Sequence, residues 1–208
     1  MNQNIEKTKV KSGKILPLME TFTTIQGEGF HSGKSAHFLR IGGCDIGCHW
    51  CDIKESWNSS LYPLVKVEKI LESINSLTDL VIISGGEPLI WNMAHLTGAL
   101  KKINKKVHLE TSGAYQLSGH WDWICLSPKK NKPPIPALFK KANELKVIVY
   151  NKDDLTFAKQ NAKYVEKDCI LFLQPEWSKK EKVMPMISKF MLENPSWRLS
   201  IQTHKYLG

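Results

Sequence analysis

The chain has 208 residues and a formal net charge of +9, and 42% of its residues are hydrophobic and 24% are charged. This length suits one domain with a substantial core, and we expect a single domain over residues 1–208. The charge comes from paired lysines, because Arg40 and Arg198 are the only arginines. Nucleic-acid-binding surfaces usually combine arginine with exposed aromatic residues, so we expect no nucleic-acid partner and interpret the lysines as solvated helix faces and loop tips.

No apolar run approaches the ~20 residues of a membrane-spanning helix, and residues 1–14 are polar, without the apolar core of a signal peptide. We therefore expect no membrane association and a cytoplasmic protein with reduced thiols. A generally positive surface could still steer anionic ligands or an acidic electron donor toward the protein.

Short apolar runs alternate with amphipathic segments along most of the chain. After an extended segment at 15–22, the apolar runs predict strands at 37–41, 79–84, 107–111, 123–126, 145–150, 169–173 and 198–201. The intervening segments predict a loop at 56–63 and helices at 67–77, 93–103, 136–143, 152–160 and 180–192.

This alternation predicts βα units and a parallel sheet. Nearly every predicted strand ends in a polar or glycine-containing cluster, and α/β proteins build their active sites at the carboxyl ends of the strands. The chain is too short for an eight-unit barrel. We therefore expect an α/β fold in the form of a partial, open βα barrel with about six parallel strands.

Three cysteines lie close together directly after the run at 37–41. Cys44, Cys48 and Cys51 have the spacing C-x3-C-x2-C on a glycine-rich loop. Three thiolates can each bind one iron of a 4Fe–4S cluster and leave the fourth iron open for chemistry. A zinc site completed by His49 or a distant cysteine is an alternative, as are a disulfide framework or simply buried cysteines. The spacing favours the open cluster.

A second signal is Gly85-Gly86-Glu87-Pro88, which follows the run at 79–84. Its glycines expose backbone groups that can hold an amino-acid headgroup, although a tight turn with Pro88 at a helix start explains the same residues. Together with the cysteine loop, this stretch resembles the radical S-adenosylmethionine superfamily. The resemblance implies that S-adenosylmethionine chelates the open iron and that its one-electron cleavage gives a 5′-deoxyadenosyl radical, which removes a hydrogen atom from substrate.

Further motifs resemble one family within that superfamily, the 7-carboxy-7-deazaguanine synthases. They are Ile25–Gly29, Phe38–Arg40, Cys51-Asp52 followed by Trp57, Ser127–Lys129, Gln174-Pro175 and Gln202–Lys205. The resemblance implies ring contraction of 6-carboxy-5,6,7,8-tetrahydropterin to 7-carboxy-7-deazaguanine with loss of ammonia, in queuosine or 7-deazapurine biosynthesis. It also implies a flavodoxin- or ferredoxin-type electron donor and a homodimer.

The resemblance further implies roles for individual residues. Glu28 and His204 are candidates for catalytic proton handling. The implied substrate-binding residues are Ile25, Gln26, Gly27, Glu28, Arg40, Ser84 and the chain-terminal Gly208. The implied cofactor-binding residues are His49, Trp50, Asp52, Gly86, Glu87, Ser127, Pro128, Lys129 and Gln174. A surface ion pair for Arg40 and a solvated side chain for His204 are the simpler alternatives.

One position departs from the family pattern. The family commonly has Ser or Thr after Cys-Asp, and this hydroxyl is a ligand of Mg²⁺, but here the residue is Ile53, which offers no oxygen. The ion is therefore held by substrate and water, is absent, or is replaced by another cation such as Lys54. Two other functions compete with the synthase: an activating enzyme that installs a radical on a partner protein, and a zinc-bearing nucleic-acid-binding module.

Overall fold

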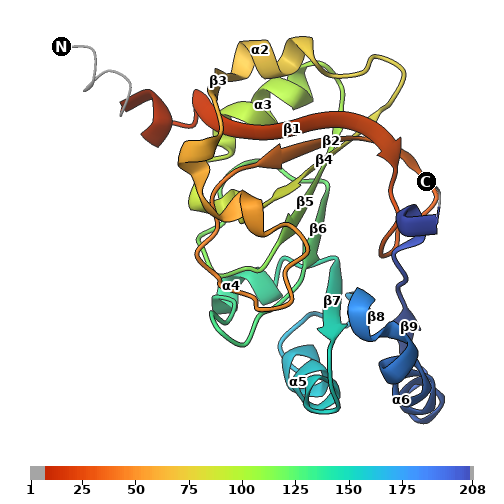
Figure 1. The fold of residues 1–208 in the computed structure, drawn as a ribbon. Helices are drawn as coiled ribbons and strands as arrows, with labels where there is room; N and C mark the ends of the chain where they lie inside the picture. Colours follow the sequence, from red (N-terminus) through yellow and green to blue (C-terminus); the bar gives the residue numbers. More distant parts are fainter. Residues whose placement is uncertain (1–7, 207–208) are drawn as a thin grey trace.

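The structure is a computed structural model, and it describes residues 8–206. One nine-stranded sheet organises this part of the chain, in the order β3-β1-β2-β4-β5-β6-β7-β8-β9 (Figure 1). The strands are β1 (Ile15–Ile25), β2 (Ser35–Ile41), β3 (Leu64–Lys66), β4 (Leu80–Gly85), β5 (Lys106–Thr111), β6 (Trp123–Leu126), β7 (Glu144–Val149), β8 (Ile170–Pro175) and β9 (Trp197–Leu199). From β2 to β9 all neighbours are parallel, whereas β1 runs antiparallel to β2 and to β3.

The expected partial barrel is confirmed. Its parallel part has seven strands, close to the expected six, and its end strands β3 and β9 do not pair with each other. The predicted extended segment at 15–22 is a longer strand, β1, which pairs with β2 as an antiparallel edge. The short strand β3 was not predicted, because its few residues show no alternating pattern of their own.

The helices are α2 (Val67–Glu72), α3 (Ala94–Lys102), α4 (Pro136–Phe139), α5 (Asp153–Ala162) and α6 (Lys180–Glu193). In Figure 1, α2 and α3 lie near β1, β2 and β4, and α5 and α6 lie near β7 to β9. α3 packs on β5, α5 on β7 and α6 on β8, and the buried aliphatic side chains of these elements form one continuous core. No helix among residues 8–206 is long and apolar enough to cross a membrane.

Helix α2 ends five residues earlier than its periodicity predicts. The hydroxyl of Ser73 donates to the carbonyl of Ile70 (2.7 Å), and the side chain of Asn75 accepts from the amide of Leu77 (2.8 Å). Such local bonds offer the backbone a turn in place of further helix. The apolar period therefore continues in the sequence after the helix has ended.

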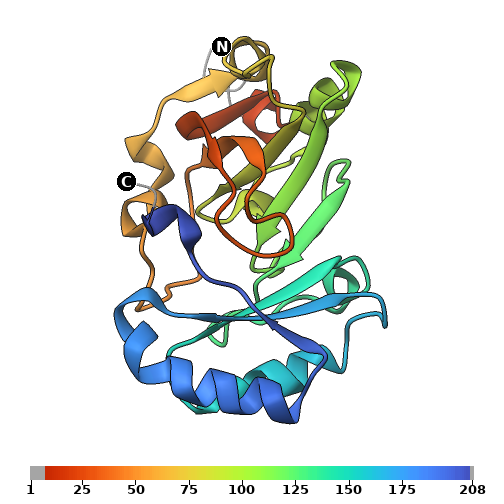
Figure 2. The ribbon, with the colours of Figure 1, turned by 90° about the vertical axis from the view of Figure 1, so that its right-hand side faces the viewer.

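Two segments bridge the open side of the barrel. The β1–β2 loop, residues 26–34, donates from Gly29 N to the Ser200 hydroxyl (2.9 Å) and from Phe30 N to the Glu144 carboxylate (2.9 Å). Thr203, in the segment after β9, donates its amide to the Gly27 carbonyl (3.0 Å). Figure 2 shows these two segments crossing between the halves of the sheet. They bring Gly27 and the carboxylate of Glu28 next to the carboxyl ends of the strands.

Candidate active site

A cavity of about 460 Å³ opens at the carboxyl ends of the parallel strands. Its wall takes residues from the ends of β4, β5, β6 and β8, from the β1–β2 loop and from the segment that follows β9. This is the edge at which the polar strand-end clusters predicted an active site. The cysteine loop and the residues of the Ile25–Gly29 motif therefore face one common space.

The cysteine loop begins directly after β2 and holds its three thiols at the cavity wall. Cys44, Cys48 and Cys51 are free, partly exposed and line the cavity. Burial raises the pKa of Cys44 to about 11 and also raises the pKa of Cys48, so binding of iron must release protons. Within residues 8–206, no group of three or more His, Cys, Asp or Glu side chains is placed to hold a single metal ion. A cluster makes a different demand, because each thiolate binds its own iron.

The Gly85-Gly86 turn is packed against this loop. Gly86 donates to the Ile41 carbonyl (3.0 Å), and Glu87 donates its amide to the Gly43 carbonyl (2.8 Å). Gly85 has a φ of +127°, and a Cβ at Gly86 would lie 2.3 Å from the Gly43 oxygen. Only glycine therefore fits at these positions, and the backbone of the turn stays open to a ligand.

The Glu87 side chain is 1% exposed and is occupied by protein donors. Its carboxylate accepts from the Leu89 amide (3.1 Å), the Thr111 hydroxyl (2.6 Å), and both the amide (2.7 Å) and the hydroxyl (2.5 Å) of Ser112. These bonds fix the turn to the end of β5. Any contact of Glu87 with a cofactor is therefore best made by its backbone.

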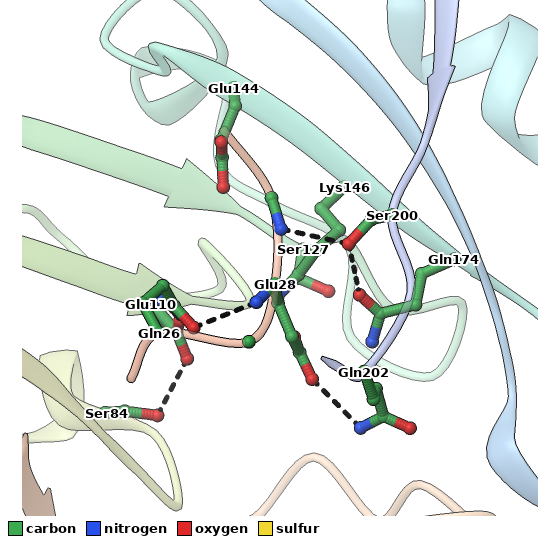
Figure 3. Close-up of polar contacts among 12 residues, drawn as sticks. Gln26, Glu28, Ser84, Glu110, Ser127, Glu144, Lys146, Gln174, Ser200 and Gln202 are labelled. Carbon is green, nitrogen blue, oxygen red and sulfur yellow. Dashed lines mark hydrogen bonds and ion pairs between the residues drawn. The ribbon is translucent and has the colours of Figure 1, made fainter. Parts of the chain in front are cut away.

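Gln26 and Ser84 meet at a carboxylate that the sequence analysis did not single out. The Gln26 amide donates to one oxygen of Glu110 (2.9 Å), and the Ser84 hydroxyl donates to the other (3.0 Å), as Figure 3 shows. Gln26 also accepts from the amide of Glu28 (3.1 Å), which fixes the turn of the β1–β2 loop. Three side chains from three elements thus form one hydrogen-bonded wall.

Glu28 forms a buried ion pair with Lys146 of β7 and accepts from the Gln202 amide at 2.9 Å. Burial raises the pKa of Glu28, but the Lys146 ammonium and the two hydrogen bonds outweigh it and hold this pKa at about 2. Burial lowers the pKa of Lys146, yet the carboxylates of Glu28, Glu110 and Glu144 raise it well above its ordinary value. Both groups are therefore charged at neutral pH.

The far wall is organised by Gln174 and the turn after β6. Gln174 is 2% exposed and accepts from the Ser200 hydroxyl at 2.7 Å. Lys129 donates to the hydroxyl of Ser127 (2.7 Å) and to its carbonyl (2.5 Å), and lies 5.6 Å from the ring centroid of Trp50. These contacts make Ser127, Lys129 and Gln174 fixed parts of the cavity beside the cysteine loop.

Arg40 extends from β2 into the cavity wall. Its guanidinium lies 3.3 Å from the carboxylate of Glu20 and 5.3 Å from the ring centroid of Phe22, and its side chain is 28% exposed. The alternative of a surface ion pair for Arg40 is thus observed: Arg40 lines the cavity, whereas its partner Glu20 does not. Glu20 is half exposed, and solvent weakens such a pair, so a substrate carboxylate can compete for the guanidinium.

The C-terminal segment closes the wall near position 53. Asp52 lies 3.6 Å from the Lys205 ammonium and 3.5 Å from the Gln202 amide, and Ile53 lines the cavity. His204 also lines the cavity, and a Cβ at Gly27 would lie 2.3 Å from its Nδ1. The side chain of Ile53 has no oxygen that could bind Mg²⁺, and the carboxylate of the adjacent Asp52 already faces the ammonium of Lys205. This donor set does not fit a tightly held Mg²⁺.

Two predicted site residues, His49 and Pro128, do not line the cavity. The exposed His49 ring makes an edge contact with Tyr150, with centroids 4.9 Å apart, and is not part of the cavity wall. Pro128 is buried behind Ser127 and Lys129 and does not line the cavity. Gly208 lies outside the described residues. Lys54, the suggested replacement for the metal, is exposed and also outside the wall.

Sequence reasoning missed Glu110, Lys146 and Cys125 as residues of the cavity wall. Cys125 was expected only to be a buried thiol, and it is 3% exposed. A signal for the other two existed, because Glu110 and Lys146 are charged residues inside apolar strand runs. Burial of a charge requires a partner, which a functional pocket often supplies.

Comparisons with known proteins agree with this site. Residues 39–119 match the Radical SAM superfamily. The chain is 57% identical over 199 residues to the 7-carboxy-7-deazaguanine synthase of Flavobacterium psychrophilum, covering 96% of this chain and 95% of that protein. It is 44% identical to the synthase of Synechocystis, covering 92% of each chain. The crystal structure of QueE from Escherichia coli superposes with a TM-score of 0.82 at 28% identity, covering 95% of this chain and 98% of that one.

The partial barrel, the three-cysteine loop and the Gly85-Gly86 turn packed against it define a radical S-adenosylmethionine enzyme with a 4Fe–4S cluster. The likeness to the named synthases extends over nearly the whole chain and includes the segments that line the cavity. The chain belongs to the 7-carboxy-7-deazaguanine synthase family. This membership does not favour either the partner-activating enzyme or the zinc-bearing nucleic-acid-binding module.

Proposed function

We propose that this protein converts 6-carboxy-5,6,7,8-tetrahydropterin to 7-carboxy-7-deazaguanine with loss of ammonia, a step of queuosine and 7-deazapurine biosynthesis. One observation carries the proposal: Gln26, Glu28 and Arg40 line the same cavity as the three cysteines. A pterin bound to the first group would therefore lie beside a cofactor bound to the second. A concave cavity of about 460 Å³ suits such a substrate better than a segment of a partner protein.

The residues present fit the cofactors. Cys44, Cys48 and Cys51 would hold the cluster, since all three are free and face the cavity. The open backbone at Gly86, with Trp50, Asp52, Ser127, Lys129 and Gln174, would hold S-adenosylmethionine, and His49, Glu87 and Pro128 would support this site from its edge. When bound, these groups supply one-electron cleavage of the sulfonium and abstraction of a hydrogen atom from substrate.

The residues around the β1–β2 loop would bind and orient the pterin. The guanidinium of Arg40 would donate two parallel hydrogen bonds to the substrate carboxylate. Such a bidentate contact neutralises the charge of the carboxylate and also fixes the orientation of the substrate. Ser84 and Gln26 are held by Glu110, so their remaining donor and acceptor positions are fixed before substrate arrives. Ile25 and Gly27 would complete this wall, and Gly208 would approach it from the chain end.

Glu28 and His204 both line the cavity and would have different roles in the proton chemistry of the ring. With a pKa of about 2, Glu28 is a carboxylate at neutral pH. It can therefore accept hydrogen bonds from N–H groups of the ring, but it cannot act as a general acid. The positive charge of Lys146, held on Glu28, would stabilise negative charge that develops on the substrate ring. His204 faces the cavity from the C-terminal segment and is the candidate for proton return.

We also propose the wider setting of the reaction. The cluster requires an external one-electron donor, for which a flavodoxin- or ferredoxin-type protein is suited. Residues 1–208 would act as a single domain, and the enzyme would be a homodimer. Free cysteine thiols and an oxygen-sensitive cluster favour the reducing cytoplasm.

The direct test is anaerobic turnover of the carboxypterin by the reconstituted enzyme with S-adenosylmethionine and a chemical reductant, with the product identified by mass. The expected product is the deazaguanine acid, together with ammonia. A Cys48→Ala protein prepared identically is the matched control and should give none. Unchanged carboxypterin in the presence of an intact cluster and cleaved S-adenosylmethionine would show that the substrate is a different one.

A further inference from the structure

A second, smaller cavity lies behind the candidate active site. Its volume is about 10 Å³, which is roughly the room needed by one water-sized molecule. Gln26, Glu28, Glu110 and Cys125 line both cavities, so these side chains are the partition between them. A small molecule formed in the large cavity therefore has only one layer of side chains to pass.

Aromatic rings form the outer wall of the small cavity. Phe30 of the β1–β2 loop stacks on Trp123, with ring centroids 5.1 Å apart. The ring of His31 lies 4.5 Å from that of His108 and 4.6 Å from that of Trp123. Both ring nitrogens of His31 and the indole nitrogen of Trp123 are buried without a hydrogen-bond partner among the described residues. Unpaired buried polar atoms are costly, and a small guest that donates a hydrogen bond would satisfy the lone pair of a neutral His31 ring.

The wall of this cavity is rich in negative charge. Glu28, Glu110 and Glu144 line it, whereas Lys146 contacts Glu28 from the side of the large cavity and does not line the small one. Figure 3 shows these carboxylates gathered around the β1–β2 loop. A cationic guest is therefore favoured over a neutral one of the same size.

The two histidines do not oppose a cation. Burial, with the nearby charges of Lys34 and Lys106, lowers the pKa of His31, and burial together with His31 lowers the pKa of His108 to about 3. Both rings are therefore neutral at physiological pH, and each has a nitrogen lone pair to offer. Burial also raises the pKa of Glu144, so a cation beside this carboxylate would offset the cost of its burial.

We propose that the small cavity binds the ammonia released by the ring contraction and holds it as ammonium on its way out of the enzyme. This inference rests on the proposed function, because that reaction supplies the ammonia. In the elimination the C–N bond breaks, the nitrogen keeps the electron pair, and the proton lost from the ring carbon returns to that nitrogen. The ammonia then takes a proton from solvent, which leaves ammonium facing the carboxylates of the wall, and no oxidant or reductant is consumed.

Thermal unfolding of the reconstituted enzyme tests the site without turnover. Ammonium chloride should raise the Tm by about 3–6 °C at roughly ten times its Kd. Sodium chloride, potassium chloride and tetramethylammonium chloride at equal ionic strength should not. Glu144→Gln should abolish the ammonium effect, because it removes the charge but keeps an acceptor for the Phe30 amide. Glu166→Gln, at an exposed partner of Lys140, is the control and should keep the effect.

His31→Phe is the second variant, and it decides the matter if Glu144→Gln does not fold. It keeps an aromatic ring at this position but removes both unpaired nitrogens, and the ammonium effect should be lost. An equal rise with potassium would show a general monovalent-cation site and overturn the assignment, as would an ammonium effect that survives both variants. Ammonium stabilisation in an enzyme that makes no deazaguanine acid would leave the site intact and refute the proposed reaction instead.

Discussion

Glu28 of the β1–β2 loop and Lys146 of β7 form an ion pair in which the side chains are only 15% and 5% exposed. The pair joins a loop near the start of the chain to a strand in its last third, across the interior of the open barrel. Because the loop also carries Gln26 and Gly27, the pair fixes the position of the whole candidate substrate wall. Removing either partner should therefore affect both folding and the site.

Replacing Lys146 with Met should destabilise the protein by about 3–5 kcal/mol, because the carboxylate of Glu28 would remain buried without its cation. The measurement is the free energy of unfolding from denaturant titration at neutral pH. Lys140→Met is the matched control, since Lys140 pairs with Glu166 on the surface and its loss should cost at most about 1 kcal/mol. Equal effects of the two substitutions would show that the buried pair contributes no more than a surface pair.

The same pair predicts a dependence of stability on pH. The pKa of Glu28 falls from its ordinary value of 4.5 to about 2 in the folded protein, so its contribution is fully present above 4.5 and is lost as the pH falls toward 2. The difference in unfolding free energy between wild type and Lys146→Met should therefore shrink across this window. Denaturant titrations at several pH values measure it, and a difference that stays constant down to pH 2 would contradict the assignment.

The predicted substrate contact of Arg40 is tested by Arg40→Lys. Lysine keeps the charge but cannot make the bidentate contact, so the KM for the carboxypterin should rise roughly tenfold or more. Binding of S-adenosylmethionine should not change. Arg198→Lys is the control, because Arg198 is the other arginine and lies exposed on β9. A loss of S-adenosylmethionine affinity with an unchanged pterin KM would place Arg40 in the cofactor site instead.

The three cysteines of the loop should each be needed for iron. Alanine at Cys44, Cys48 or Cys51 should lower bound iron and abolish turnover, as measured by iron and sulfide content and by anaerobic assay. Cys169→Ala should keep both, since this thiol is buried away from the cavity. Cys125→Ala should keep the cluster, although Cys125 borders the substrate wall. Iron lost from Cys125→Ala but kept in Cys48→Ala would refute the loop as the cluster site.

The sequence was sufficient to predict the parallel strands β2 and β4 to β9 and the edge of the sheet at which the cavity lies, because both follow from local patterns. The C-x3-C-x2-C spacing and the glycine turn indicate the backbone geometry of a few neighbouring residues. Contacts between residues on opposite sides of the barrel cannot be predicted in this way. The apolar run around Lys146 signals a buried charge, but nothing near it in the sequence identifies Glu28 as its partner, because that depends on where the β1–β2 loop lies. The same holds for Glu110, whose partners come from two other elements.

Position 53 provides the last prediction, and the structure changes its reasoning in one respect. Lys54 is exposed and does not line the cavity, so the protein cation beside position 53 is Lys205, whose ammonium lies 3.6 Å from the carboxylate of Asp52. Since isoleucine offers no oxygen and Asp52 already faces an ammonium, Mg²⁺ should bind weakly.

Turnover by chelator-treated wild type at saturating substrate should therefore respond only slightly to added Mg²⁺, whereas Ile53→Thr should show a stronger, saturable response, because its hydroxyl adds an oxygen ligand. Ile148→Thr makes the same replacement on β7 at the same cavity and should behave as wild type. Direct binding of Mg²⁺, measured by calorimetry in the presence of substrate, should follow the same order and separates metal affinity from catalytic rate. A tight and strict requirement in the wild type would mean that substrate and water hold the ion unaided, and that the protein cations do not replace it.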